Sequence, residues 1–211
     1  MPHRQAPPAL ALALLTGLLV GCQGPTEGLA YGEELYETCA QCHMADGHGN
    51  DTITTPAIAG LPQWYVEAQL HNFRDGVRGT HPEDLAGMRM RPMAMSLQND
   101  TQLQAVAEYV SSLPAAPAGV ATLGGDPTKG QTYYAVCLAC HGADGSGNEA
   151  LKAPAIAGSE DWYVVEQLEK FRSGARGADP RDAQGAQMRP MAMTLPDEQA
   201  MKDVAAYIQS L

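Results

Sequence analysis

The sequence predicts an all-α protein built from two tandem copies of one domain, related by an internal repeat. Its landmarks recur at a constant offset of 98 residues, from Cys39 and Leu113 in the first copy to Cys137 and Leu211 in the second. Apolar residues recur at spacings of three and four, as on one face of a helix, and we find no convincing strand. An offset without insertion or deletion indicates a duplicated domain with two equivalent sites.

Three helices are predicted in each copy. The first leads into a cysteine pair, over residues 33–39 and 129–137, where good helix formers stand without an internal proline. The second and the last each present one apolar face, and Gly76 and Gly174 are expected to end the second. The apolar positions are Val66, Leu70 and Phe73 with Val164, Leu168 and Phe171, and then Leu103, Val106, Ala107 and Val110 with Met201, Val204, Ala205 and Ile208.

The domain boundaries follow from composition. We expect domain 1 over residues 31–113 and domain 2 over residues 127–211, joined by a linker over residues 114–126 that is rich in Ala, Gly and Pro. The whole chain has only two Phe and two Trp, so each copy has little apolar material for a core. A small domain of this kind is marginal unless a bound group adds to its core.

Each copy carries one Cys-x-x-Cys-His motif, at 39–43 and at 137–141. This pattern is the covalent attachment signal for c-type haem, whose vinyl groups take up the two thiols. The adjacent histidine, His43 or His141, is then held under the iron as the proximal ligand. The sequence therefore predicts two covalently bound haem c groups, attached through Cys39, Cys42, Cys137 and Cys140.

The alternative for each motif is a zinc site or a dithiol redox pair, because one Cys-x-x-Cys-His nearly supplies the four ligands that zinc takes. Four of the five cysteines belong to the motifs and the fifth is Cys22, so no pair is left over for a disulfide. The export signal described below and the methionines that follow each motif favour haem over both alternatives.

The sixth iron ligand decides the function, because a thioether opposite histidine raises the reduction potential and closes the iron to substrates. Six of the ten methionines lie in two clusters, although methionine often serves only as a flexible core filler. The residues alone do not choose among the members of each cluster, which are Met90, Met93 and Met95 in the first copy and Met188, Met191 and Met193 in the second.

Other repeated residues suit either a haem pocket or ordinary packing. The carbonyl groups of Pro56 and Pro154 are candidates to orient the proximal histidines, or belong to simple loop prolines. Arg91 and Arg189 either pair with haem propionates or lie solvated at the surface. The same two alternatives, propionate contact or core packing, hold for the aromatic residues Trp64, Tyr65, Trp162 and Tyr163.

With these motifs in place, residues 30–211 resemble the tandem dihaem class I cytochromes c, in particular cytochrome c4. The likeness lies in the two haem motifs, the Pro-x-x-x-Gly segments, the helix with Gln-Leu and Phe, and the methionine before the final helix. It implies two all-α class I cytochrome c domains related by a pseudo-twofold, with their haem edges close. In that family the axial methionine stands seven residues before a leucine, here Leu97 or Leu195, which points to Met90 and Met188. Met93 and Met191 are the alternatives.

The N-terminus predicts a lipoprotein signal peptide over residues 1–21. A short basic region precedes an apolar run over residues 9–20, which is too short for an ordinary membrane span. Residues 19–22 resemble a bacterial lipobox, in which cleavage before the cysteine is followed by its acylation. We therefore expect a lipidated Cys22, a spacer over residues 22–30 and a membrane-anchored protein in the periplasm. The alternative is an ordinary cleaved signal.

The charge balance and the resemblance together bound the function. Beyond Arg4 the chain keeps 12 Lys and Arg against 24 Asp and Glu, which disfavours nucleic acid and suits a basic protein partner or plain solubility. The resemblance implies a one-electron carrier, not an enzyme, that links a quinol-oxidising complex to a terminal oxidase and has no small-molecule substrate. The nearest alternative is an electron-transfer subunit of a periplasmic dehydrogenase or reductase. A dihaem peroxidase is less favoured, because both copies carry the same methionine cluster.

Overall fold

The computed structural model describes residue 1 and residues 24–211 of the chain, so the predicted signal segment and Cys22 lie outside the described residues. Within residues 24–211 the structure is helical and contains no strand, only isolated bridges at Asn50–Thr55 and Asn148–Ala153. The prediction of an all-α fold is confirmed. In the part of the chain described, no helix is both long and apolar enough to cross a membrane.

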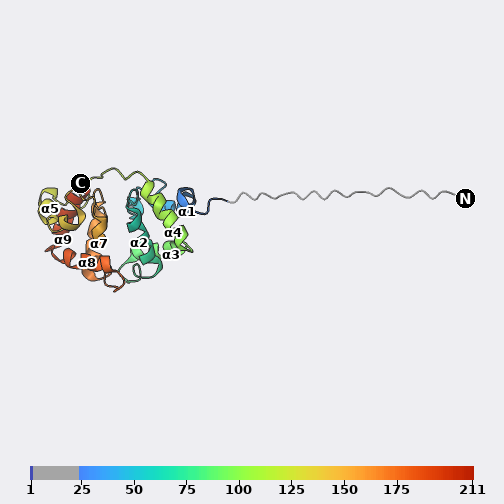
Figure 1. The fold of residues 1–211 in the computed structure, drawn as a ribbon. Coiled ribbons are helices and arrows are strands. Elements are labelled where there is room, and N and C mark those ends of the chain that lie inside the picture. Colours follow the sequence, from blue (N-terminus) through green and yellow to red (C-terminus); the bar gives the residue numbers. More distant parts are fainter. Residues whose placement is uncertain (2–23) are drawn as a thin grey trace.

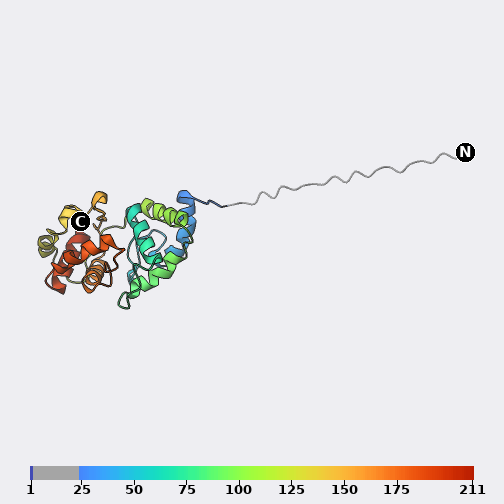
Figure 2. The same cartoon turned by 60° about the horizontal axis from the view of Figure 1, so that its bottom comes forward.

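Two similar sets of helices follow one another along the chain. Domain 1 contains α1 (Gly28–His43), η1 (Asp51–Ile53), α2 (Gln63–Arg74), α3 (Leu85–Met95) and α4 (Asp100–Ser112). Domain 2 contains α5 (Pro127–Tyr134), α6 (Leu138–His141), η2 (Glu149–Leu151), α7 (Asp161–Ser173), α8 (Ala183–Met193) and α9 (Glu198–Ser210). Figure 1 shows them as two lobes in which α2 and α7 face each other, and Figure 2 shows the same two lobes from another side.

In each domain the first helix crosses the last at very close range, α1 over α4 and α5 over α9. The crossing requires glycine, because a side chain at Gly32 would overlap the Ala105 carbonyl group, and one at Gly130 would overlap the Asp203 carbonyl group. Beside each crossing two tyrosine rings pack at a centroid distance of 5.2 Å, Tyr36 with Tyr109 and Tyr134 with Tyr207. The repeat in sequence is therefore also a repeat in packing.

The predicted apolar face of the last helix is buried in both domains. The corresponding face of α2 is also buried, but that of α7 is only partly so, because Val164 and Leu168 line a cavity while Phe171 is buried. Gly174 caps the end of α7 with a φ of 86°, whereas α2 ends one residue earlier in its copy, at Arg74. These positions are where the sequence predicted the helices to end, within one or two residues.

Three features were not expected from the sequence. Helix α1 begins at Gly28, inside the segment 22–30 that we expected to be a spacer. The helix that leads into the second motif is interrupted between α5 and α6, whereas α1 is continuous. The methionine clusters also lie on helices, α3 and α8, although each contains an internal proline, Pro92 or Pro190. Those prolines and a weak apolar periodicity hid these helices from sequence reasoning.

Candidate haem sites and the interface between them

The two cysteine motifs occupy equivalent places in the repeat: the first lies at the end of α1, and the second follows α5 and ends with α6. Cys39 and Cys137 are half-buried against the two hydrophobic cores, whereas Cys42 and Cys140 are exposed. Burial raises the pKa of both Cys39 and Cys137 to about 11, so these thiols are protonated near neutral pH. Zinc binding and dithiol redox chemistry both require the thiolate. Among the described residues no group of three or more His, Cys, Asp or Glu side chains is arranged to hold a metal ion.

The two motif histidines are buried and oriented in the same way. His43 is 4% exposed and His141 6%. The Nδ1 atom of His43 lies 2.9 Å from the Pro56 carbonyl oxygen, and that of His141 lies 2.8 Å from the Pro154 carbonyl oxygen. Desolvation lowers the pKa of each imidazole despite this hydrogen bond, which favours the neutral ring. A neutral ring whose Nδ1–H donates to a carbonyl group leaves Nε2 free to bind a metal.

A cavity in domain 2 brings the motif and the methionine cluster together. Cys137, Cys140 and His141 line it, and so do Met188 and Met191 from α8. Its wall is largely apolar, with contributions from Val164, Leu168, Phe171, Ile156, Leu195 and Val204. An apolar cavity with the thiols and the imidazole on one element and thioethers on another fits a haem held between two axial ligands.

The methionines of each cluster differ in burial. Met90 and Met188 are half-buried, and Met90 packs against the core of domain 1. Met93 is 42% exposed and Met191 38%. Met95 and Met193 are more exposed still, at 51% and 55%. Burial therefore ranks the three positions in the same order in both domains.

The cavity of domain 2 is not built by domain 2 alone. Trp64, Tyr65 and Gln69 from α2 of domain 1 line it as well, beside Gln167 and Arg176 of domain 2. The haem crevice of domain 2 therefore opens toward the interface with domain 1, and residues of one domain form part of the surroundings of the other domain's site.

Two glutamines and two arginines form the centre of this interface. Gln69 Oε1 accepts hydrogen bonds from Arg78 Nη1 at 2.9 Å and from Arg176 Nη2 at 3.0 Å. Gln167 Oε1 accepts from Arg176 Nη1 at 2.9 Å and from Arg78 Nη2 at 2.8 Å. Each arginine also stacks on a phenylalanine of its own domain, at 4.5 Å and 4.6 Å from the ring centroid. The arrangement obeys the twofold symmetry of the repeat.

Three buried arginine donors in the described part of the chain have no partner, the Nε atoms of Arg78, Arg91 and Arg176. Unpaired buried donors are costly, so a missing acceptor is expected beside them. The carboxylates of a bound haem would be acceptors of the right charge, and Arg176 lines the cavity that would hold such a haem. Sequence reasoning named Arg91 but missed Arg78 and Arg176, although their 98-residue offset marks them as a repeated pair.

Three of the four repeated aromatic residues contact the opposite domain. Trp162 Nε1 donates to Asp51 Oδ1 of domain 1 at 3.1 Å, while the Trp64 ring lies 5.1 Å from the ammonium group of Lys152. The hydroxyl group of Tyr65 accepts a hydrogen bond from Arg176 at 3.2 Å. Trp64, Tyr65 and Trp162 therefore help to join the two domains.

Two helical domains of this form, each with a buried histidine beside a cysteine pair and a half-buried methionine on a later helix, define a dihaem c-type cytochrome. The comparisons agree: the family model described as cytochrome c matches twice, over residues 29–114 and 127–211. The chain belongs to the cytochrome c family and is cytochrome c4-like. It holds two covalently bound haem c groups and serves as an electron carrier.

Among its relatives, cytochrome c4 of Azotobacter vinelandii is 30% identical over 221 residues, covering 96% of this chain and 98% of that protein. A thiosulfate dehydrogenase electron acceptor of Stutzerimonas stutzeri is 32% identical over 164 residues, covering 72% and 71%. The structure of reduced recombinant cytochrome c4 from Pseudomonas stutzeri superposes with a TM-score of 0.72 at 25% identity, over 88% of this chain and 99% of that one. Thiosulfate dehydrogenase (TsdBA) from Marichromatium purpuratum gives 0.71 at 29% identity, and this chain covers 85% of its own length and 39% of that chain.

Proposed function

We propose that the protein is a periplasmic one-electron carrier that accepts electrons from a quinol-oxidising complex and delivers them to a terminal oxidase. Each bound haem stores one electron by cycling between its ferrous and ferric states. The observation that supports the role best is the closed character of the site in domain 2, where the buried His141 and the methionines Met188 and Met191 line one apolar cavity. Two protein ligands per iron suit electron transfer and leave no position for a substrate.

At the residue level, the haem of domain 1 is attached to Cys39 and Cys42 with His43 and Met90 as axial ligands. The haem of domain 2 is attached to Cys137 and Cys140 with His141 and Met188. The carbonyl groups of Pro56 and Pro154 fix the histidine rings. The greater burial of Met90 and Met188 within their clusters supports these ligands over Met93 and Met191.

The ligand assignment is tested by replacing the methionines one at a time in matured holoprotein. Met90→Ala and Met188→Ala should each remove one Met–Fe absorption signal, lower the potential of one haem and let that iron bind carbon monoxide. Met93→Ala and Met191→Ala are the matched controls and should do much less. The reverse ranking in the spectra would transfer the ligand role to Met93 and Met191.

The membrane anchor belongs to the same proposal. Cleavage behind Gly21 and acylation of Cys22 would hold the globular part near the membrane, since residues 23–27 before α1 span at most about 18 Å. Cys22→Ser should abolish labelling by radioactive palmitate and either release the protein or leave the precursor uncut. A wild-type protein that is fully soluble in the periplasm would contradict the anchor.

A second candidate function is that of electron acceptor for a periplasmic dehydrogenase. The relative from Stutzerimonas stutzeri that is named a thiosulfate dehydrogenase electron acceptor supports this alternative. The oxidised holoprotein distinguishes the two when it is mixed either with a quinol-oxidising complex and quinol, or with a thiosulfate dehydrogenase and thiosulfate. Fast reduction by the first system only is expected. Reduction by the second only would assign the dehydrogenase role.

A further inference from the structure

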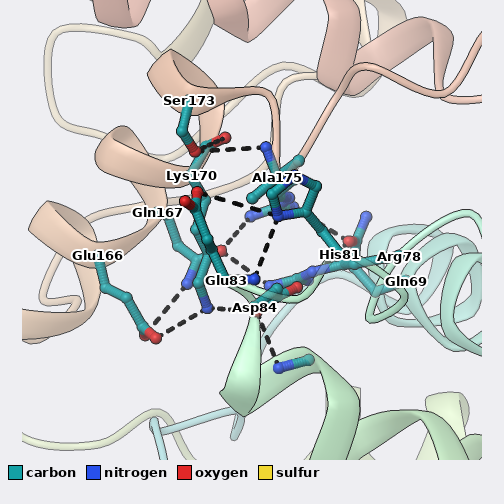
Figure 3. A network of polar contacts seen from close by, with 12 residues as sticks. Gln69, Arg78, His81, Glu83, Asp84, Glu166, Gln167, Lys170, Ser173 and Ala175 are labelled. Carbon is teal, nitrogen blue, oxygen red and sulfur yellow. Dashed lines mark hydrogen bonds and ion pairs between the residues drawn. The ribbon is translucent and has the colours of Figure 1, made fainter.

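The interface network is twofold symmetric in its Arg–Gln core but not in its charges. Lys170 of α7 crosses to domain 1, where its Nζ atom lies 2.6 Å from Asp84 Oδ1 (Figure 3). Its side chain is 8% exposed, and that of Asp84 is fully buried. The repeat places Asn72 where Lys170 stands and Asp182 where Asp84 stands. Within the described residues Asp182 makes no ion pair, so the buried carboxylate is matched by a lysine in one domain only.

Asp84 is the repeat partner of Asp182, which lines the cavity of domain 2. It is the N-cap of α3, where its Oδ1 atom accepts a hydrogen bond from the Gly87 backbone N–H at 2.9 Å. Asp182 caps α8 in the same way, through Gly185 at 2.8 Å, and lines the haem cavity of domain 2. Because the two capping arrangements match, Asp84 lies at the equivalent wall of the haem site in domain 1. The helix that it caps carries Met90.

Charged groups of both domains act on the Asp84 carboxylate. Lys170 also pairs with Glu166 of its own helix at 2.8 Å, and Arg78 acts on Asp84 through space. Burial acts to raise the pKa of Asp84, but the Lys170 ammonium group, the Gly87 N–H and Arg78 hold it below its ordinary value. Asp84 is therefore ionised near neutral pH. The repeat positions of Lys170 and Glu166 in domain 1 are Asn72 and Ala68, so domain 1 offers Asp182 neither of these two charges.

We propose that Lys170, although it belongs to domain 2, sets the reduction potential of the haem in domain 1. It does so by placing its positive ammonium group against the Asp84 carboxylate at the wall of that site. A positive charge in a poorly solvated environment stabilises the ferrous form and raises the potential, and a carboxylate does the opposite. The lysine thus offsets part of the negative field of domain 1. This role of Lys170 requires that both haems are bound. The proposed axial ligands serve only to assign each spectral signal to its haem, and the identity of the electron donor and acceptor has no bearing on it.

The experiment must separate this electrostatic role from a purely structural one, because the same ion pair also joins the domains. Replacing either Lys170 or Asp84 would loosen the interface. A purely structural effect would therefore shift the potential of the haem in domain 1 in the same direction in both variants. The electrostatic role predicts opposite directions. Lys170→Gln leaves Asp84 unpaired and should lower the potential of the haem in domain 1, whereas Asp84→Asn leaves Lys170 unpaired and should raise it.

The measurement is a spectroelectrochemical titration of the full dihaem protein. The two haems are assigned by the Met–Fe signal that disappears in Met90→Ala or in Met188→Ala. We expect each change to alter the one-electron equilibrium between the haems by on the order of tenfold, or about 59 mV. Lys170→Arg, which keeps the charge, should stay near the wild-type value. Lys202→Gln, which removes a lysine paired with Glu198 away from the interface, should move both potentials much less.

A gain-of-function variant provides a second test that removes no contact. By the twofold symmetry, Asn72→Lys places a lysine opposite Asp182 and should raise the potential of the haem in domain 2 while leaving domain 1 nearly unchanged. If Lys170→Gln or Asp84→Asn does not fold with both haems, the potential of the haem in domain 2 of Asn72→Lys tests the proposal by itself. Shifts of the same sign in Lys170→Gln and Asp84→Asn, or an unchanged haem in domain 2 of Asn72→Lys, would overturn the proposal.

Discussion

The two domains have the same kind of core and the same kind of haem site, but they differ in net charge. Residues 23–113 hold 12 acidic and 4 basic side chains, a balance of −8, whereas residues 121–211 hold 12 acidic and 8 basic ones, a balance of −4. The buried histidines, the carbonyl groups that orient them and the capping aspartates match closely in both. Duplication has thus kept what attaches a haem and changed what surrounds it. Two equal sites in unequal surroundings can differ in potential without any difference in ligands.

Backbone geometry after the motifs shows a second difference between the domains. Met44 follows the first motif with φ 65° and ψ 162°, a combination that glycine tolerates and other residues rarely adopt. Gly142 follows the second motif with φ 82° and ψ 162°. The carbonyl groups of both residues accept a hydrogen bond from a tyrosine, Tyr36 at 3.0 Å and Tyr134 at 2.8 Å. Domain 1 therefore holds a strained residue where domain 2 does not.

The largest effect is expected from removing one motif histidine. His43→Ala should damage the haem site of domain 1 and largely spare that of domain 2, and His141→Ala should do the reverse, because each core is built from its own helices. Mass spectrometry of protein matured in a haem-attaching host should show two covalent haems in the wild type. Spectra of each variant should show one intact site. Loss of both sites from a single substitution would show that the domains do not act as separate units.

Filling a helix crossing should be the next largest effect. Gly32→Ala and Gly130→Ala each force a methyl group against a backbone carbonyl of the last helix, in domain 1 and domain 2 respectively. Overpacking of this kind costs about 1–3 kcal/mol of unfolding free energy, and a rigid backbone contact puts it at the upper end. Urea titration followed by circular dichroism measures it. The neighbouring exposed positions provide controls, since Glu33→Ala and Gln131→Ala should change stability by about 0.5 kcal/mol or less.

A smaller and opposite effect is expected where the backbone is strained. Met44→Gly should stabilise domain 1 by about 1 kcal/mol, because glycine adopts the required φ and ψ without cost, although it also adds freedom to the unfolded chain. Gly142→Met should destabilise domain 2 by a similar amount. Chemical unfolding of the two variants beside the wild type checks both signs. A destabilised Met44→Gly protein would indicate that the methionine side chain contributes more than the strain costs.

The smallest effect concerns the order of the two potentials. The more negative field of domain 1 stabilises its oxidised iron, so we expect the haem of domain 1 to have the lower potential and that of domain 2 to be reduced first. Docking to a basic partner through domain 1 should weaken as salt rises, because the screening length is about 10 Å at 0.1 M. A redox titration of the wild type at low and high salt measures the order. Equal potentials, or the opposite order, would show that burial and hydrogen bonding outweigh surface charge.

The sequence by itself determined the features that depend on local spacing. The constant offset predicted two equivalent domains, the periodic apolar residues predicted the helices α2, α4, α7 and α9, and the two motifs predicted where haem is attached. The repeat also marked Pro56 and Pro154 as candidate acceptors for the histidines, with simple loop prolines as the alternative, and the structure shows both contacts. These features could be predicted because they depend on a local spacing or on a repeat that the sequence displays directly.

Only the tertiary structure decided what meets across the interface. Nothing in the spacing of Lys170 and Asp84, or of Arg176 and Gln69, brings them together, because their contact requires two finished domains to pack by α2 and α7. The helices α3 and α8 likewise form despite their prolines, since each is capped by a buried aspartate. Side-chain contacts between distant segments depend on packing, and packing sums many weak interactions that no short pattern records.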